Sequence, residues 1–233
     1  MTWTRRPITA LVAAAVVGAL MTATPSVARA DDAPIAAVET ASGARVESVE
    51  FVGGQQYLVT VYSPSMDRSV PLQVFRPADT SAPRPTYYLL NGASGGEDPS
   101  SNWPDQADVS TFFADKNVNV VVPKAGAFSY YTDWVADDPE LGRNKWETFL
   151  LDELPPLMNR SLGTTGTQAV GGISMAASAV LMLAADRPGF YSSVASFSAC
   201  AGTSDDLGRA FVKLVVEARG GGDTENMWGP DDG

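Results

Sequence analysis

The sequence predicts an α/β fold, in which a mainly parallel sheet has an antiparallel edge on its N-terminal side and helices on both faces. Two observations predict it. Three β-type runs separated by turn residues follow one another up to Phe75, which favours antiparallel neighbours. From Thr86 onward, short apolar runs alternate with loops and helical segments. This alternation is typical of right-handed crossovers between parallel strands.

The antiparallel edge is expected from Arg45–Val52, Gln56–Ser63 and Ser69–Phe75. Gly53-Gly54 and Pro64-Ser65 stand between these runs as turn signals. Chain reversal at each turn would lay the three strands side by side.

The parallel part is expected from apolar runs that suit strands buried on both faces, Thr86–Leu90 (TYYLL) and Val118–Val122 (VNVVV). Pro155-Pro156 is expected to bend or end the helix in which it falls. The remaining predicted elements are helices at Val109–Lys116, Lys145–Met158 and Met175–Ala185, and strands at Gln168–Gly171 and Ser193–Phe197.

Residues 1–30 have the organisation of a secretory signal peptide. Arg5 and Arg6 precede the mostly apolar run Ile8–Met21, and Ala28-Arg29-Ala30 offers small residues for cleavage. The apolar run is shorter than the roughly 18 residues that a membrane span needs. We therefore expect export to the cell envelope or medium with cleavage near Ala30, no stable membrane span, and a single domain over residues 31–233.

Charge excludes one class of partner. The predicted signal peptide holds three of the 16 basic residues and none of the 27 acidic ones, so the remaining chain has 13 basic residues and a formal charge of −14. Phosphate-rich partners would be repelled. Nucleic acid is therefore not expected as a ligand.

The chain has no histidine and one cysteine, Cys200. Histidine-containing zinc sites and a Ser-His-acid triad are thus excluded within this chain. No ligand cluster or phosphate-binding glycine motif indicates a metal or organic cofactor. Cys200 is expected either as a buried thiol or as one half of a pair.

The segment Gly172-Ile173-Ser174-Met175-Ala176 carries the main chemical signal. A predicted strand enters it and a helix leaves it, as in the nucleophile elbow of α/β hydrolases. Ser174 would then be the nucleophile, with the Met175 N–H directed at the developing oxyanion. The alternative is that Ser174 only caps a helix. The strand before it and the helix after it favour the nucleophile.

The loop after Leu90 gives a second signal. Asn91-Gly92-Ala93-Ser94-Gly95-Gly96 is rich in small residues, so its amides can approach a ligand closely. In hydrolases of this fold such a loop supplies the second oxyanion N–H. An ordinary turn remains the alternative.

With these two segments placed, the chain resembles the secreted actinobacterial mycolyltransferases of the antigen 85 type, members of a wider esterase family, over residues 56–230. The resemblance rests on Tyr88-Leu-Leu-Asn-Gly92, Phe128-Ser-Tyr-Tyr-Thr-Asp-Trp134, Asn144-Lys-Trp-Glu-Thr-Phe-Leu150, Gly172-Ile-Ser-Met-Ala176 and Asn226-Met-Trp-Gly-Pro230.

This resemblance implies an α/β-hydrolase fold and a ping-pong reaction. A serine, here Ser174, takes a long acyl group from a trehalose ester and passes it to trehalose or a cell-wall sugar. The amides of Met175 and Ala93 correspond to the oxyanion hole. Asn91 and Ser94 stand where mycobacterial members carry an aspartate and an arginine that hold the sugar. The implied partners are an acyl-trehalose glycolipid and a sugar acceptor, without a cofactor.

The resemblance also implies that part of the fold is missing. Family members continue beyond the matching end and place the triad acid and histidine there, whereas Gly233 lies 59 positions after Ser174. We expect a domain without its C-terminal strands, an impaired reaction, and a later cysteine as the partner of Cys200. No motif assigns a catalytic role to the downstream carboxylates Asp205, Asp206, Glu217 and Glu225.

Two alternatives to the acyltransferase remain open. One is a non-catalytic envelope protein that binds glycolipid or matrix through the surviving face. The other is a plain carboxylesterase for small acyl esters. Acyl length, acceptor sugar and oligomeric state have no signature in the sequence.

Overall fold

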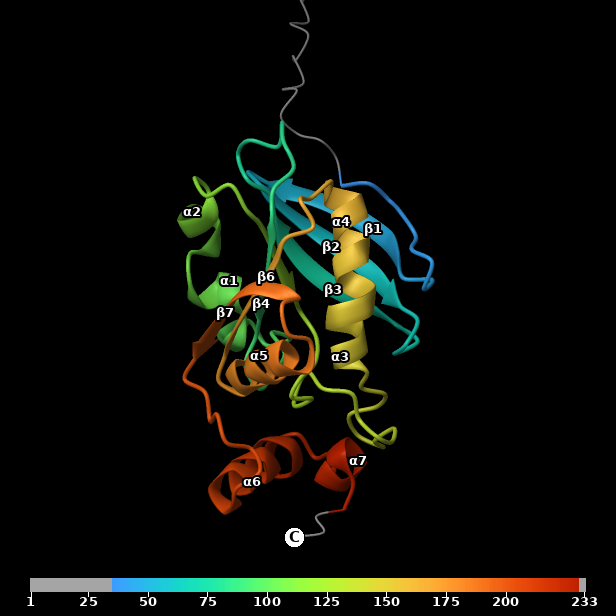
Figure 1. The fold of residues 1–233 in the computed structure, drawn as a ribbon, viewed down its shortest axis with the longest axis vertical. Coiled ribbons are helices and arrows are strands. Elements are labelled where there is room, and N and C mark those ends of the chain that lie inside the picture. Colours follow the sequence, from blue (N-terminus) through green and yellow to red (C-terminus); the bar gives the residue numbers. More distant parts are fainter. Residues whose placement is uncertain (1–34, 231–233) are drawn as a thin grey trace, which may run out of the picture.

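The computed structural model describes residues 35–230, and the predicted signal peptide lies outside these residues. The described chain forms one seven-stranded sheet in the order β1-β2-β3-β5-β4-β6-β7 (Figure 1). Helical segments lie on both sides of it.

The antiparallel edge consists of β1 (Arg45–Gly53), β2 (Gln56–Ser63) and β3 (Arg68–Phe75). All three run antiparallel to their sequence neighbours, and β3 also pairs antiparallel with β5. Gly53 and Gly54 take φ values of 140° and 57° at the first reversal, a conformation that favours glycine. The predicted N-terminal edge is confirmed.

The other four strands run parallel to one another: β5 (Asn119–Pro123), β4 (Thr86–Leu90), β6 (Gln168–Ile173) and β7 (Tyr191–Phe197). β4 lies between β5 and β6, so its C-terminal end is central in the sheet. Loops that follow β4 and β6 therefore leave neighbouring positions at the same edge of the sheet. The predicted parallel part of the fold is confirmed.

One face of the sheet is covered by a long helical layer. This layer comprises α3 (Trp146–Thr148), the π-helical segment η2 (Phe149–Glu153), α4 (Leu154–Leu162) and α5 (Met175–Asp186). Trp146, Phe149 and Leu150 are fully buried in the main core with Tyr88 and Leu90 of β4. The apolar periodicity of this segment therefore reflects the side chains that pack against the sheet.

The opposite face carries a smaller layer of short elements: η1 (Pro99–Ser101), α1 (Trp103–Gln106) and α2 (Val109–Phe113). Leu89, Val120 and Val122 form a second, smaller core with Val109 on this side. Alternate side chains of β4 thus enter different cores, which is the period-two pattern of a strand buried on both faces.

Pro155-Pro156 does not end its helix. The backbone widens to π geometry over Phe149–Glu153, where the Leu154 N–H bonds to the Phe149 carbonyl, and α4 then continues to Leu162. A proline lacks the N–H that an interior helical turn needs. At the first positions of α4 after a wide turn, that missing donor is tolerated.

Three C-terminal segments were not expected from the sequence: α6 (Asp206–Lys213), the π-helical segment η3 (Leu214–Arg219) and α7 (Thr224–Trp228). Asp205 begins α6 by accepting a hydrogen bond from the Gly208 N–H at 2.7 Å. Within residues 35–230, no helix combines the length and apolarity needed to cross a membrane.

Candidate active site

Ser174 occupies the sharp turn between β6 and α5. Its backbone has φ 56° and ψ −120°, a combination that residues with a side chain rarely adopt. Two backbone bonds hold it there: its N–H donates to the Phe197 carbonyl, and its carbonyl accepts from the Ala177 N–H, both at 3.0 Å. The predicted strand-to-helix turn is confirmed.

The Ser174 side chain does not cap α5. No hydrogen bond runs from its hydroxyl to the first turn, and the residue is exposed. Four N-cap aspartates in the described chain do accept such a bond, Asp98, Asp108, Asp205 and Asp223. The capping alternative is therefore wrong, and the hydroxyl is available to a ligand.

Small neighbours make this turn possible. A Cβ added at Gly172 would lie 2.6 Å from the Ala176 carbonyl oxygen and 2.8 Å from its Cβ. Both distances are shorter than van der Waals contact allows, so β6 and α5 can approach only with glycine at 172. Ala176 itself is fully buried.

The loop after β4 lies directly beside Ser174. A Cβ added at Gly92 would be 3.5 Å from the Ser174 Cβ and 3.6 Å from the Ile173 carbonyl oxygen. Ala93 follows, buried, and its carbonyl accepts a hydrogen bond from the Phe128 N–H at 2.7 Å. The two segments singled out in the sequence therefore meet.

A cavity of about 560 Å³ opens at this meeting point. Its walls combine apolar groups with hydroxyls, one carboxylate and one guanidinium. The residues that line it are Gly92, Ala93, Ser94, Asp98, Ser100, Ser101, Asn102, Trp103, Gln106, Ala107, Ile173, Ser174 and Arg219. A space of this size holds a small organic group such as a sugar.

Met175 is anchored from the other side. Its side chain is buried, and its sulfur accepts a weak hydrogen bond from the Tyr130 N–H at 3.4 Å. Phe128, Tyr130 and Tyr131 all take positive φ in this loop. A strained loop packed on Met175 fixes the start of α5, where the first backbone N–H groups have no partner inside the helix.

Asn91 is placed differently from the sequence-based expectation of a sugar contact. The residue is fully buried and does not line the cavity. Its side-chain N–H donates to the Pro123 carbonyl at 2.9 Å, and its oxygen accepts from the Trp103 N–H at 2.8 Å. In this arrangement Asn91 joins β4, β5 and α1 and supports the cavity from behind.

Ser94, the other residue expected to contact sugar, does line the cavity. It is half-buried, and its hydroxyl forms a hydrogen bond with the Ser101 hydroxyl. Ser100 and Ser101 of η1 add two further hydroxyls to the same wall. A cluster of neutral hydroxyls can exchange hydrogen bonds with a polyhydroxyl ligand.

The charged groups of the cavity are Asp98 and Arg219. The Ser100 N–H donates to the Asp98 carboxylate at 2.8 Å and lowers the pKa of Asp98, which keeps this group ionised. The four downstream carboxylates named above do not line the cavity: Asp205 caps α6, Asp206 pairs with Arg209, Glu217 accepts from Thr224, and Glu225 belongs to α7.

Sequence reasoning missed Arg219 and Trp103. A close approach of Phe128 to Gly220, where an added Cβ would lie 2.7 Å from the Phe128 Cβ, brings the end of η3 to the cavity. Trp103 is positioned by its indole N–H, which donates to the Leu90 carbonyl at 2.8 Å. Nothing in the spacing of either residue points to Ser174, because both contacts are long-range.

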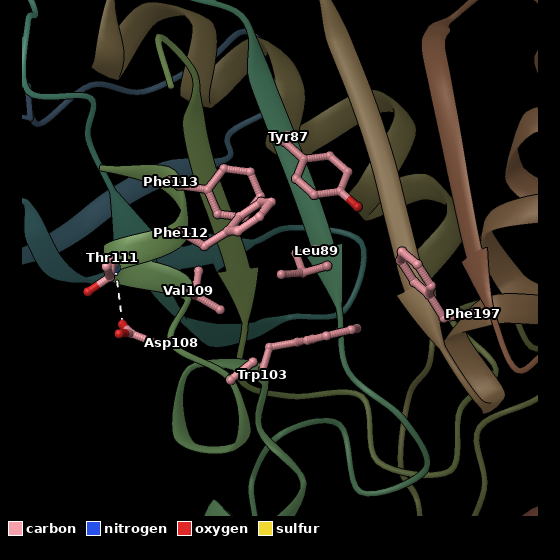
Figure 2. A pocket seen from close by; sticks show the side chains of 10 residues that line it. Tyr87, Leu89, Trp103, Asp108, Val109, Thr111, Phe112, Phe113 and Phe197 are labelled. Carbon is pink, nitrogen blue, oxygen red and sulfur yellow. Dashed lines mark hydrogen bonds between the residues drawn. The ribbon is translucent and has the colours of Figure 1, made fainter. Parts of the chain in front are cut away.

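A second cavity, of about 570 Å³, lies on the α1–α2 side of the sheet (Figure 2). It shares Trp103 and Ala107 with the Ser174 cavity. Its walls are mainly apolar, and the Asp108 carboxylate in them accepts the Thr111 N–H at 3.0 Å. Over the described residues, no group of three or more histidine, cysteine or acidic side chains is arranged to hold a metal ion.

Comparison with known sequences places the chain in a family. A family profile described as "Putative esterase" matches residues 63–233. The chain is 35% identical over 182 residues to the diacylglycerol acyltransferase/mycolyltransferase Ag85B of Mycolicibacterium smegmatis, covering 75% of this chain and 54% of that protein. It is 34% identical to Ag85A of Mycobacterium leprae, covering 73% and 52%. The chain thus spans about half the length of the curated relatives it matches.

Solved structures agree with the fold. Mycobacterium tuberculosis MPT51 (FbpC1) superposes with a TM-score of 0.62 at 27% identity, covering 76% of this chain and 63% of that one. An S-formylglutathione hydrolase from Agrobacterium tumefaciens superposes with a TM-score of 0.57 at 16% identity, covering 72% and 67%, which supports the α/β-hydrolase fold alone. The chain therefore belongs to the esterase family of α/β-hydrolase fold and is a relative of the antigen 85 mycolyltransferases.

Proposed function

We propose that this protein belongs to the acyl-transfer machinery of the cell envelope, as a serine-dependent acyltransferase or esterase of the mycolyltransferase type. The observation that carries the proposal is the strained, exposed Ser174 on a strand-to-helix turn that opens into a cavity. The similarity to Ag85-type proteins supports a long-chain acyl group and a trehalose-type sugar as the substrates.

In the proposed reaction, the Ser174 hydroxyl oxygen attacks the carbonyl carbon of an acyl-trehalose ester. The carbonyl oxygen becomes an oxyanion, which the N–H groups of Met175 and Ala93 would stabilise. Collapse breaks the bond to the sugar oxygen, which leaves with the proton that Ser174 gave up. A second sugar hydroxyl then attacks the acyl-serine, and the reverse proton movement restores Ser174.

Each step needs a group that accepts and returns the proton. Serine is a poor nucleophile without an adjacent base. Histidine is absent from the sequence, and the Asp98 carboxylate has a lowered pKa, which makes it a weak base. We therefore propose that residues 31–233 alone keep only the part of catalysis that binding and oxyanion stabilisation supply.

The proposed sugar subsite is the hydroxyl-rich wall of the cavity. Ser94 and Ser101 are close enough to bond to each other, and Trp103 offers an aromatic face beside them. Sugars combine hydroxyls with an apolar ring face, so this wall fits their chemistry. Arg219 faces the same space and can donate to sugar oxygens or to a carbonyl.

The test is acyl transfer by the exported protein, residues 31–233, from an acyl-trehalose donor to isotope-labelled trehalose. Imidazole in the buffer supplies the missing base. We expect labelled acyl-trehalose to form in excess over a Ser174→Ala control. Equal transfer by both proteins would refute the proposal.

A second candidate is glycolipid binding without turnover. The observation that favours it is the combination of an intact, hydroxyl-lined cavity with no histidine. Binding is measured as a change of tryptophan fluorescence on addition of trehalose monoester, with Trp103→Phe as the control that removes the reporter beside the cavity. Binding that survives Ser174→Ala, with no transfer under any buffer condition, would favour this candidate.

A further inference from the structure

The loop that follows β5 contacts both segments of the proposed oxyanion hole. We call residues 125–131 the bracing loop. Its Phe128 N–H donates to the Ala93 carbonyl at 2.7 Å, and its Tyr130 N–H donates to the Met175 sulfur at 3.4 Å. Ala93 and Met175 are the two residues whose own N–H groups would stabilise the oxyanion. A single segment therefore holds both sides of the proposed hole.

The bracing loop also meets the glycine-rich loop after β4 at the distance of backbone contact. A Cβ added at Gly95 would lie 2.5 Å from the Ala127 nitrogen and 2.8 Å from the Ala125 carbonyl oxygen. Both distances are too short for a side chain, so the two loops can touch only with glycine at 95. A displacement of the bracing loop would therefore be passed on to the loop that carries Ala93.

The backbone of the bracing loop is strained. Phe128, Tyr130 and Tyr131 have φ values of 58°, 54° and 50°, in the left-handed region that bulky residues rarely adopt. Such a conformation persists only where the surrounding contacts determine it, and it is concentrated at functional sites. The bracing loop therefore depends on contacts that hold it in place.

Ser129 supplies several of these contacts. The residue is fully buried, and its hydroxyl donates to the Gly126 carbonyl at 2.7 Å and accepts the Tyr131 N–H at 3.1 Å. Its own carbonyl accepts the Trp134 indole N–H at 3.0 Å. In sequence, Ser129 stands between the two residues whose N–H groups reach the proposed hole. Its hydroxyl thus closes the turn from which both of these contacts are made.

Aromatic packing supports the same turn from the core. A Cβ added at Gly126 would lie 2.8 Å from the Tyr131 ring and 3.0 Å from the Trp146 ring. These two rings are buried and meet edge to face, with centroids 5.4 Å apart. Since Trp146 belongs to α3, the bracing loop is fixed on the helical layer that covers the sheet.

We propose that Ser129 is a positioning residue of the acyl-transfer site, whose hydroxyl fixes the bracing loop and thereby the separation of the Ala93 and Met175 N–H groups. This role rests on the proposed function, because it requires that the two N–H groups bind an oxyanion. Ser129 does not line the Ser174 cavity, so it acts through the bracing loop and not on the substrate. Donors to an oxyanion are effective only when they are already in place.

Loss of the Ser129 hydroxyl should act mainly on the transition state. Ser129→Ala removes the hydrogen bonds to Gly126 and Tyr131 and allows the strained turn to relax. The ester carbonyl becomes an oxyanion only as Ser174 attacks it. We therefore expect the maximum rate of acylation to fall roughly tenfold to a hundredfold, with little change in the ester concentration that gives half of that rate.

The test measures acylation of the exported protein, residues 31–233, by an activated long-chain ester with imidazole present, over a range of ester concentrations. The rate found for Ser174→Ala is subtracted. The matched control is Ser161→Ala on α4, since Ser161 is also buried and its hydroxyl donates to the Ala36 carbonyl at 2.8 Å. Both variants lose a buried hydrogen bond, but only Ser129→Ala should slow acylation.

A thionoester distinguishes loss of the oxyanion hole from a general loss of stability. Its C=S group places sulfur, a weaker hydrogen-bond acceptor than oxygen, where the oxyanion would form. Relative to the reaction with imidazole alone, the parent protein should favour the ester over the thionoester. Ser129→Ala should reduce this preference, because its rate falls for the ester and changes little for the thionoester. Ser161→Ala should keep the preference of the parent.

Met175→Leu is a second variant, for the case that Ser129→Ala does not fold. It removes the sulfur that the Tyr130 N–H contacts at nearly constant side-chain volume, so it should keep the circular dichroism spectrum and also reduce the preference for the ester. A folded Met175→Leu protein with the parent's preference would overturn the positioning role.

The remaining outcomes separate this role from the proposed function. A parent protein that is acylated no faster than Ser174→Ala would refute the proposed function, and the positioning role with it. Acylation of the parent with an unchanged rate and ester preference in Ser129→Ala would overturn the positioning role alone. An equal loss of rate in Ser161→Ala would do the same.

Discussion

At Ser174 the backbone is held in a conformation that costs roughly 1–3 kcal/mol. The surrounding contacts determine it: the bond to Phe197 fixes its N–H, and the packing of Gly172 on Ala176 fixes the approach of strand and helix. A strained residue whose side chain remains exposed and uncapped suggests that its position serves a ligand, because stability alone would favour a relaxed turn.

Gly172→Ala is expected to lower the free energy of unfolding by about 1–3 kcal/mol, because the new methyl group would meet the Ala176 backbone at 2.6 Å. The matched control is Gly202→Ala, where the nearest atom is the movable Asp205 carboxylate oxygen at 3.0 Å. Urea unfolding of both variants measures the difference. Equal stability would contradict the close packing of β6 on α5.

Variants at Asn91 and Ser94 are expected to distinguish a residue that stabilises the fold from one that contacts the ligand. Asn91→Ala removes the hydrogen bonds to the buried Pro123 carbonyl and the Trp103 N–H, so the free energy of unfolding should fall by roughly 1–3 kcal/mol. Ser94→Ala should leave stability within about 0.5 kcal/mol of the parent and weaken sugar binding. Urea unfolding and trehalose titration distinguish them, and the reverse pattern would restore Asn91 as a sugar contact.

Some of the site could be predicted because it is local. Gly172, Ser174 and Ala176 lie within five residues, and the strained turn they form depends on their size. The burial of Asn91 could not be predicted, since it arises from contacts with β5 and α1, which are distant in sequence. Arg219 was missed for the same reason, because it reaches the cavity through the fit of Gly220 against Phe128.

At the scale of elements, Asp138 ties the C-terminal helices to the body of the protein. Its buried carboxylate accepts the N–H groups of Glu140 and Leu141 on one oxygen, and the Asp223 N–H and the Asn226 side chain on the other, all at 2.9 Å. The start of α7 is thereby fixed on the loop that precedes α3.

Asp138 should make the molecule sensitive to acid. Burial raises the pKa of its carboxyl, but the four hydrogen bonds outweigh burial and hold the pKa below its usual value. A depressed pKa stabilises the fold above the unfolded-state value of about 4, and this stability is lost as pH falls through the folded-state value. Asp138→Asn should therefore lower stability near neutral pH by about 1–3 kcal/mol and flatten its acid dependence.

Thermal unfolding between pH 3 and pH 7 measures this effect. Asp137→Asn is the control, because Asp137 is an exposed neighbour paired with Arg143. An identical pH profile for both variants would contradict the role of Asp138.

Elements with strong periodicity were predicted well, and those set by packing were not. The strands of the sheet follow from alternating or continuous apolar runs. The continuation of α4 past Pro155 follows a π turn whose residues Phe149 and Leu150 are fully buried. α6 and α7 begin at aspartate caps but lack a long apolar repeat, so their sequence is close to that of a loop.

At the scale of the whole molecule, export remains a prediction from residues 1–30. Secreted protein should begin at Asp31 or within a few residues of it, because Ala28-Arg29-Ala30 offers small residues to the signal peptidase. N-terminal sequencing of the culture medium measures this. An intact Met1 on membrane-bound protein would contradict it.

The central proposal is that Ser174 accepts an acyl group when a base is supplied. The most direct measurement is the intact mass of the exported protein after incubation with an activated long-chain ester, followed by peptide mapping. Without imidazole, we expect no adduct in excess over Ser174→Ala. With imidazole, one acyl group should appear on Ser174 and be absent from the variant. Acylation elsewhere, or an equal adduct in both proteins, would contradict the claim, and rapid acylation of Ser174 without imidazole would show that another residue serves as the base.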